Sequence, residues 1–194
     1  MTDRRRSYVL QVQLQDIRPA IWRRIHVADT TTLMQLHTIV QAAMGWEDRH
    51  AWAFDIAGQC FGLPDADWAD DPTLAARRYT VDQLLQGKPL RMRYYYDFND
   101  RWEHRIKLHE CVLVDSATAA QLPQCVAGRH ACPPEDCGGV AGYQLLRLNH
   151  PDASFTLESA QARVQAAPLH PQRINPALRR PQQLAASGKD TALA

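Results

Sequence analysis

The sequence predicts an α+β protein in which helices pack against an antiparallel β-sheet. Residues 8–15 and 20–27 alternate apolar and polar side chains, as half-buried strands do. Residues 31–45 instead repeat apolar side chains at the spacing of an amphipathic helix. Two aromatic-rich runs, 90–98 and 102–114, flank a short polar stretch and indicate a β-hairpin.

The first two strands each have one apolar and one polar face. Residues 8–15 place apolar side chains on one face and glutamines on the other. Residues 20–27 place Trp22 and Arg24 on the polar face, whereas Arg23 shares the apolar face with three aliphatic side chains. The Arg23 side chain must therefore extend to solvent or find a partner.

The predicted helix over 31–45 has start and stop signals at its ends. Asp29 or one of the threonines at 30–32 can cap the first turn, and Gly45 can end the last one. Its apolar stripe predicts a face that packs on the sheet. The stripe consists of Leu33, Leu36, Ile39, Val40, Ala43 and Met44.

Shorter elements follow this helix. Residues 51–56 are expected to form a strand, and residues 57–73, rich in Gly, Pro and Asp, a loop. Thr80 is expected to cap a short helix over 81–86, with Gly87 as its stop.

The hairpin can be assigned a register. A three-residue loop at 99–101 pairs Phe98 with Trp102 and Tyr96 with His104, which leaves one face apolar and aromatic. A two-residue loop at 99–100 would mix polar and apolar side chains on both faces. We therefore expect the three-residue loop, with a polar face that carries Arg93, Tyr95, Asp97, Glu103, Arg105 and Lys107.

Composition excludes several classes of protein. The 194 residues carry a formal net charge of +1, so no global field directs the chain toward nucleic acid or membrane. No segment reaches the roughly 18 apolar residues of a membrane helix, and no secretory signal opens the chain. Five cysteines, an odd number, do not suit a complete disulfide framework. We expect a cytoplasmic protein with reduced thiols and no membrane partner.

The expected organisation is a single domain followed by a tail. Residues 1–7 are expected to be disordered and residues 8–150 to form the α+β domain, with a helix near 143–148. Residues 151–194 are rich in proline and poor in large apolar groups, which predicts a weakly structured tail with at most a weak helix over 156–166.

Four potential zinc ligands lie within thirteen residues: Cys125, His130, Cys132 and Cys137. Zinc prefers four N/S ligands, but their spacing, C-x4-H-x-C-x4-C, lacks the usual C-x2-C pair. Small cysteines that pack a tight Pro/Gly-rich loop, or a labile disulfide, explain the same residues. Zinc at these positions is therefore one of three open interpretations.

The hairpin and the cysteine segment also carry candidate catalytic groups: Asp97, Asp100, His104, Glu135 and Asp136. Adjacent carboxylates could bind a divalent cation or exchange protons, but turns and the start of a helix account for them better. The register places His104 on the apolar face, which favours a core histidine.

Other histidines and motifs add little to this set. His37 lies beside the apolar stripe of the first helix and His50 precedes a strand, so both are expected to pack or to support other groups rather than to ligate. Phosphate-binding glycine loops, H-E-x-x-H and G-x-S-x-G are all absent from the sequence.

Four motifs in order resemble one known family: PAIWRRIHV at 19–27, LHTIVQAAMGW at 36–46, YDFNDRWEH at 96–104 and C-x6-CPPEDCGG-x2-GY from 125 to 143. The chain resembles the plasmid open-reading-frame-three-like family over roughly 8–150. Members are often described as passengers of insertion elements, sometimes with a resolvase label. The resemblance implies an α+β domain and implies no activity or catalytic residues.

Two functional hypotheses follow. The first is a non-enzymatic accessory or binding module of plasmid or mobile-element origin, without a cofactor, that contacts a protein or DNA. It would present the polar face of the hairpin and the cysteine segment to its partner, and its candidate binding residues are Tyr95, Trp102, Arg23 and Arg24.

The second hypothesis is a metal-dependent hydrolase or nuclease that uses the 97–104 hairpin and the 132–137 loop. It requires these two segments to meet in space, because coordinate bonds span only about 2.0–2.6 Å. The sequence alone favours the non-enzymatic hypothesis.

Overall fold

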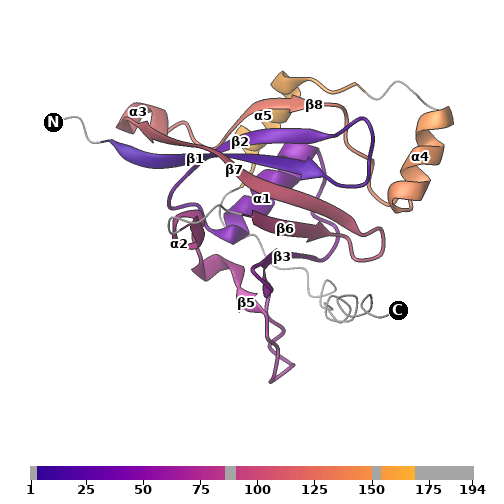
Figure 1. The fold of residues 1–194 in the computed structure, drawn as a ribbon, viewed down its shortest axis with the longest axis horizontal. Coiled ribbons are helices and arrows are strands. Elements are labelled where there is room, and N and C mark those ends of the chain that lie inside the picture. The colour runs from indigo at the N-terminus through magenta and orange to yellow at the C-terminus, as the bar shows by residue number, and fades with distance from the viewer. Residues whose placement is uncertain (1–3, 86–90, 150–153, 169–194) are drawn as a thin grey trace, which may run out of the picture.

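The computed structural model describes residues 4–85, 91–149 and 154–168, and within them an eight-stranded sheet carries the fold (Figure 1). The strand order is β5-β4-β3-β6-β7-β1-β2-β8, and every pairing is antiparallel except β4 with β5. The strands are β1 (Arg5–Leu14), β2 (Trp22–Ala28), β3 (Trp52–Ile56), β4 (Gln59–Gly62), β5 (Leu74–Ala75), β6 (Arg91–Tyr96), β7 (Trp102–Val114) and β8 (Gln124–Arg129).

Helices cover one face of this sheet. The helices are α1 (Leu33–Met44), α2 (Val81–Leu85), α3 (Ser116–Ala119), α4 (Gly139–Asn149) and α5 (Leu157–Ala166), with a 3-10 turn at Ala76–Arg78. Helices α1 and α5 contact each other and share the core with β1, β2, β6 and β7 (Figure 1). The α+β class predicted from the sequence is therefore confirmed.

Helix α1 forms as its sequence predicts. Thr32 caps the first turn by accepting a hydrogen bond from the Gln35 amide, and the Gln35 side chain bonds back to the Thr32 amide. Gly45 ends the helix in the left-handed conformation, with φ 92°. The whole predicted apolar stripe is buried against the sheet.

The hairpin has the predicted faces but not the predicted register. Tyr96 opposes Trp102 and Tyr94 opposes His104, so the loop spans five residues, 97–101, rather than three. The physical reason is Asp97, whose carboxylate accepts hydrogen bonds from the Asn99 and Asp100 amides and closes a wider turn. A shift of two residues keeps the side chains of both strands on their faces, so the buried aromatic face is as predicted. Asp97, which was predicted on the polar face, instead lies in the loop and is buried.

The ends of the chain are more ordered than expected where the structure describes them. β1 begins at Arg5, so it includes part of the segment 1–7 that was predicted to be disordered. Helix α5 lies in the predicted tail 151–194, yet its Ala160 and Val164 are buried. Residues 169–194 and Gly87, the expected helix stop, lie outside the described residues.

The remaining differences are local. Residues 59–62, predicted to belong to a loop, form strand β4 because they pair with β3 and bury Phe61. The helix capped by Thr80 is confirmed as α2. No helix within the described residues is long and apolar enough to cross a bilayer.

Candidate metal centre

The hairpin loop and the cysteine segment meet at one end of the sheet, where the segment after α1 also arrives. Trp46 stacks on Tyr96 with ring centroids 5.0 Å apart, and its indole N–H donates to the Pro133 carbonyl at 2.8 Å. The Asp97 amide donates to the Ala51 carbonyl at 2.9 Å. These contacts hold three segments, 46–51, 97–101 and 133–138, around a common point.

Glycines permit this close approach. Gly139 has φ 68°, and a Cβ there would lie 2.7 Å from the Asp100 carbonyl oxygen. The Asp100 carboxylate in turn accepts a hydrogen bond from the Gly138 amide at 3.0 Å. A side chain at 139 would force the hairpin loop and the 133–138 segment apart.

Four polar side chains converge at the junction. The Nε2 atom of His50 lies 2.9 Å from Asp136 Oδ1, 3.6 Å from Asp97 Oδ2 and 3.9 Å from Glu135 Oε2. The ligand atoms of His50, Asp97 and Asp136 all lie within 4.8 Å of one another, and they are the one such group of His, Cys, Asp or Glu among the described residues. The Asp97 side chain is buried, whereas that of Asp136 is 59% exposed.

The environment of His50 Nε2 fits a metal ion. This atom is buried and makes no hydrogen bond to any described residue. Asp136 Oδ1 lies 2.9 Å from it, but not in the direction that a hydrogen bond requires. Two neighbouring ligands about 2.1 Å from an octahedral ion lie about 3.0 Å apart. The separations of 2.9 and 3.6 Å from His50 to the two aspartates are close to that value.

Glu135 is held beside the cluster by a relay of hydrogen bonds. The Arg49 amide donates to the Tyr96 hydroxyl at 3.0 Å, and that hydroxyl donates to Glu135 Oε1 at 2.9 Å. Burial and the adjacent Glu135 carboxylate raise the pKa of Tyr96 well above its usual value, so the hydroxyl remains a donor. The same hydroxyl lies 3.2 Å from Glu135 Oε2, and the Glu47 amide donates to Oε1 at 2.9 Å, so Glu135 is held facing the centre.

Three of the five candidate catalytic side chains lie close together in the structure. Asp97, Glu135 and Asp136 meet at the centre, while Asp100 accepts from the Gly138 amide beside it. His104 is fully buried under the sheet, 5.2 Å between ring centroids from Trp46, and does not belong to the cluster. Burial lowers the pKa of His104 to about 4, which is typical of a neutral core histidine.

The four predicted zinc ligands do not gather. All five cysteines of the chain are free thiols, and neither they nor His130 belong to the ligand cluster. Cys132 instead contacts the guanidinium of Arg23 at 3.1 Å, and burial raises the pKa of this thiol to about 11. Zinc at the cysteines stays a prediction, with the cluster at His50 as the better-arranged site.

Two of the four predicted binding residues are buried. Trp102 and Arg23 are each 1% exposed, which corrects the expectation that they present a surface. Arg23 neither extends to solvent nor pairs with a carboxylate: it donates to three backbone carbonyls and lies 3.8 Å from the ring centre of Phe155. Tyr95 and Arg24 are partly exposed on the opposite face of the sheet.

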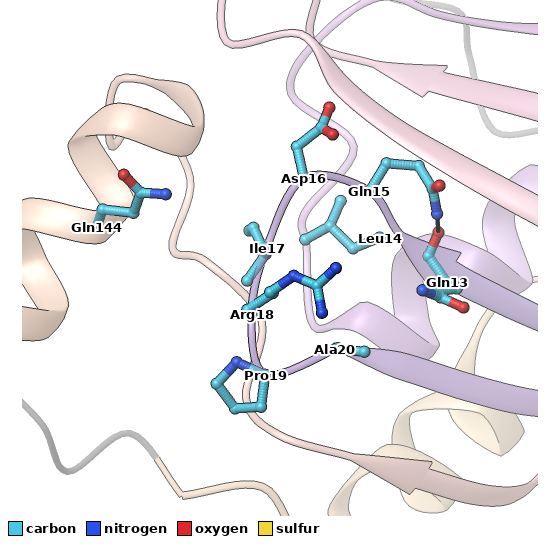
Figure 2. A pocket seen from close by; sticks show the side chains of 9 residues that line it. All are labelled: Gln13, Leu14, Gln15, Asp16, Ile17, Arg18, Pro19, Ala20 and Gln144. Carbon is cyan, nitrogen blue, oxygen red and sulfur yellow. Dashed lines mark hydrogen bonds between the residues drawn. The ribbon is translucent and has the colours of Figure 1, made fainter.

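A separate cavity of about 640 Å³ lies at the β1–β2 connection and extends to Gln144 of α4 (Figure 2). Its two charged side chains are Asp16 and Arg18, and the Gln15 amide is occupied by the Gln13 carbonyl at 2.9 Å. This hollow brings no candidate catalytic residue together, so we place the candidate site at the hairpin junction.

His50 is the residue that sequence reasoning missed. It lies 47 residues from Asp97 and more than eighty from Glu135 and Asp136 in the chain, and it belongs to no spaced motif. The pairing of β3 with β6 brings it beside Asp97. The one available signal was its position directly before a strand that flanks the hairpin.

Comparisons with known proteins agree with this architecture. The family described as Plasmid pRiA4b ORF-3-like protein matches residues 6–174, further into the C-terminal region than the resemblance noted over 8–150. The uncharacterized protein y4hQ of Sinorhizobium fredii (strain NBRC 101917 / NGR234) is 39% identical over 136 residues, which cover 70% of this chain and 68% of that protein.

A solved structure has the same fold. The crystal structure of the protein of unknown function MM3350 from Methanosarcina mazei Go1 aligns with a TM-score of 0.68 and 29% identity, over 78% of this chain and 84% of that one. Since the family match spans most of the sequence, the chain belongs to the plasmid pRiA4b ORF-3-like family.

Proposed function

We propose that the protein binds a divalent transition-metal ion through His50, Asp97 and Asp136 and uses it for metal-dependent hydrolysis. The observation that carries this proposal is the buried Nε2 of His50, which faces carboxylate oxygens from two other segments without making a hydrogen bond. A mixed imidazole and carboxylate set favours Mn²⁺ or Zn²⁺ over Ca²⁺.

The incomplete ligand set supports hydrolysis as the activity. Three protein ligands leave coordination positions for water and substrate, and the exposed Asp136 puts them next to solvent. An ion held by His50, Asp97 and Asp136 would supply Lewis-acid activation of water and of an ester or phosphoester. Glu135, which is oriented by the Tyr96 hydroxyl, would accept the proton of the attacking water, and the leaving group would take a proton from solvent.

Calorimetric titration of chelator-treated full-length protein with Mn²⁺ and Zn²⁺ tests the metal. We expect one ion per chain, and at least tenfold weaker binding after Asp136→Asn, which removes a ligand charge from an exposed position. Glu47→Gln removes a neighbouring carboxylate outside the cluster and should bind as the unaltered protein does. Cys132→Ala should also retain the ion, whereas loss of the ion in that variant would move the site to the cysteines.

The activity needs its own assay. The loaded protein should hydrolyse bis(p-nitrophenyl) phosphate, p-nitrophenyl phosphate or p-nitrophenyl acetate, and Glu135→Gln should lose turnover while it still binds the ion. Stoichiometric metal without turnover on any of the three would instead support the accessory-module hypothesis, with the ion as a docking point for an oxygen-rich ligand. Absence of metal binding would overturn the proposal.

A further inference from the structure

The face of the sheet opposite α1 and α5 carries a regular array of cations. In one row across the strands, Arg91 of β6 opposes Lys107 of β7, which lies beside Gln11 of β1 and then Arg24 of β2. Because directly opposed residues of antiparallel strands point to the same face, the three cations share one surface. We call this set and the next row the basic face.

The second row runs parallel to the first. Arg93 of β6 opposes Arg105 of β7, followed by Gln13, then Trp22 of β2, then Arg129 of β8. The basic face thus holds six cationic side chains on four strands: Arg24, Arg91, Arg93, Arg105, Lys107 and Arg129. Met92, Tyr94 and Ile106, which alternate with these cations along β6 and β7, are buried. The cations therefore point away from the core.

These cations have few partners of their own. Of the six, only Arg93 lies within 4.0 Å of a described carboxylate, Glu103 at 3.7 Å. Arg91, Arg93, Arg105, Lys107 and Arg129 are all exposed, while the Nε of Arg24 is buried and has no hydrogen-bond partner among the described residues. The strand pairing also places Asp55, opposite Arg93, and Glu103, opposite Tyr95, on this face. Because the whole chain has a net charge of only +1, six cations beside these two acids are still a local concentration of positive charge.

Aromatic side chains lie within the same array. Trp22 is partly exposed between Gln13 and Arg129, and the guanidinium of Arg24 lies 5.3 Å from its ring centre. Tyr95, partly exposed, follows Arg93 on the same face and opposes Glu103. A sheet surface that alternates cations with aromatic rings suits phosphates and unstacked bases together, whereas a duplex hides its base faces.

We infer that the basic face binds single-stranded nucleic acid, with the cations on phosphates and with Trp22 and Tyr95 under bases. This inference is independent of the metal centre, which is built from loops at the end of the hairpin. The amide side chains of Gln11 and Gln13 lie between the cations and can bond base edges or sugars.

Fluorescence anisotropy with labelled twelve-nucleotide oligo(dT) and oligo(U), at 50 to 300 mM NaCl, tests the inference and separates DNA from RNA. The logarithm of affinity should fall with the logarithm of salt at roughly −0.7 per phosphate contacted. The double variant Arg105→Glu/Lys107→Glu should bind at least tenfold more weakly. The matched double variant Arg77→Glu/Arg78→Glu, which reverses two exposed charges outside the basic face, should bind within twofold of the unaltered protein.

Trp22→Ala tests stacking and should weaken binding about fivefold or more. Equal losses of affinity in both double variants would overturn the inference, because binding would then depend on the net charge of the protein and not on the basic face. A labelled duplex that binds as tightly as the single strand, or polyglutamate that competes as well as oligo(dT), would overturn it in favour of shape-independent or acidic-protein binding. No binding at 50 mM NaCl would also contradict it.

Discussion

One continuous segment, residues 125–137, contributes to two sites of opposite character. In its middle, Cys132 lies against Arg23, which is buried and bonded to three backbone carbonyls. Its last part places Glu135 and Asp136 around the Nε2 of His50, at a junction that remains open to solvent. The polar groups of the first site are hydrogen-bonded within the fold, whereas the imidazole of the second site still lacks a hydrogen-bond partner among the described residues.

The two sites differ in whether the fold supplies hydrogen-bond partners for their buried polar side chains. Arg23 donates to carbonyl oxygens and a sulfur and contacts an aromatic ring, so the fold itself satisfies it. His50 Nε2 is surrounded by acidic oxygens and forms no hydrogen bond with the described residues. A buried cation that the fold satisfies indicates a structural role, whereas an unsatisfied imidazole among carboxylates indicates a ligand from outside.

The largest expected effect is at the enclosed site. Arg23→Met should lower the free energy of unfolding by about 3 kcal/mol or more, because it leaves the Ala43, Trp22 and Arg129 carbonyls without their donor in the interior. Urea denaturation measures this. Arg24→Met on the neighbouring exposed face is the control and should cost less than about 1 kcal/mol. Similar stabilities for the two variants would remove the structural role given to Arg23.

The core histidine His104 should make stability depend on pH. Its folded pKa of about 4 is below the usual value of about 6.5, so its neutral form is favoured by folding. Stability should therefore be complete above pH 6.5 and should fall as the pH drops from there through about 4, by up to about 3 kcal/mol for this group.

Equilibrium denaturation of the unaltered protein and of His104→Gln between pH 4 and pH 7 checks this contribution. The variant should show a flatter profile over that range. If both profiles fall in parallel, other carboxylates and histidines cause the acid sensitivity instead.

The junction depends on a glycine. Gly139→Ala introduces a Cβ 2.7 Å from the Asp100 carbonyl at a position with φ 68°, so the two loops must separate. We expect a loss of about 1–3 kcal/mol in unfolding free energy and a weaker Mn²⁺ affinity. Gly58→Ala is the control for positive φ alone, because nothing lies within 4 Å of a Cβ there. An unchanged Mn²⁺ affinity in Gly139→Ala would show that the junction tolerates separation.

The smallest expected effect concerns thiol reactivity. Burial raises the pKa of Cys132 to about 11, so this thiol should react with maleimide far more slowly than the exposed Cys111 near neutral pH. Mass spectrometry after timed labelling of the native protein gives both rates. Fast modification of Cys132 would contradict the enclosed character of the first site.

The sequence was a good guide to elements with local causes. The alternation of β1 and β2, the Thr32 and Thr80 caps and the stripe of α1 depend on neighbouring residues, and all formed as predicted. The hairpin register was missed because Asp97 caps its own loop, which no face pattern reveals when the shift is two residues.

The candidate site was predictable only in part. The hairpin and the 132–137 loop did prove to meet, and they contribute Asp97, Glu135 and Asp136. His50 was missed because its role depends on strand pairing between distant segments. Sequence spacing also did not reveal that Cys132 lies against a buried arginine, and zinc at the cysteines stays a prediction.

The most direct test of the metal centre is a crystal of the full chain soaked in Mn²⁺ and measured for anomalous scattering. We predict a peak about 2.1–2.3 Å from His50 Nε2, Asp97 Oδ2 and Asp136 Oδ1, absent from crystals of Asp136→Asn. A map with no peak there, in which His50 donates a well-directed hydrogen bond to Asp136, would show that the cluster is a structural ion pair and would contradict the proposed function.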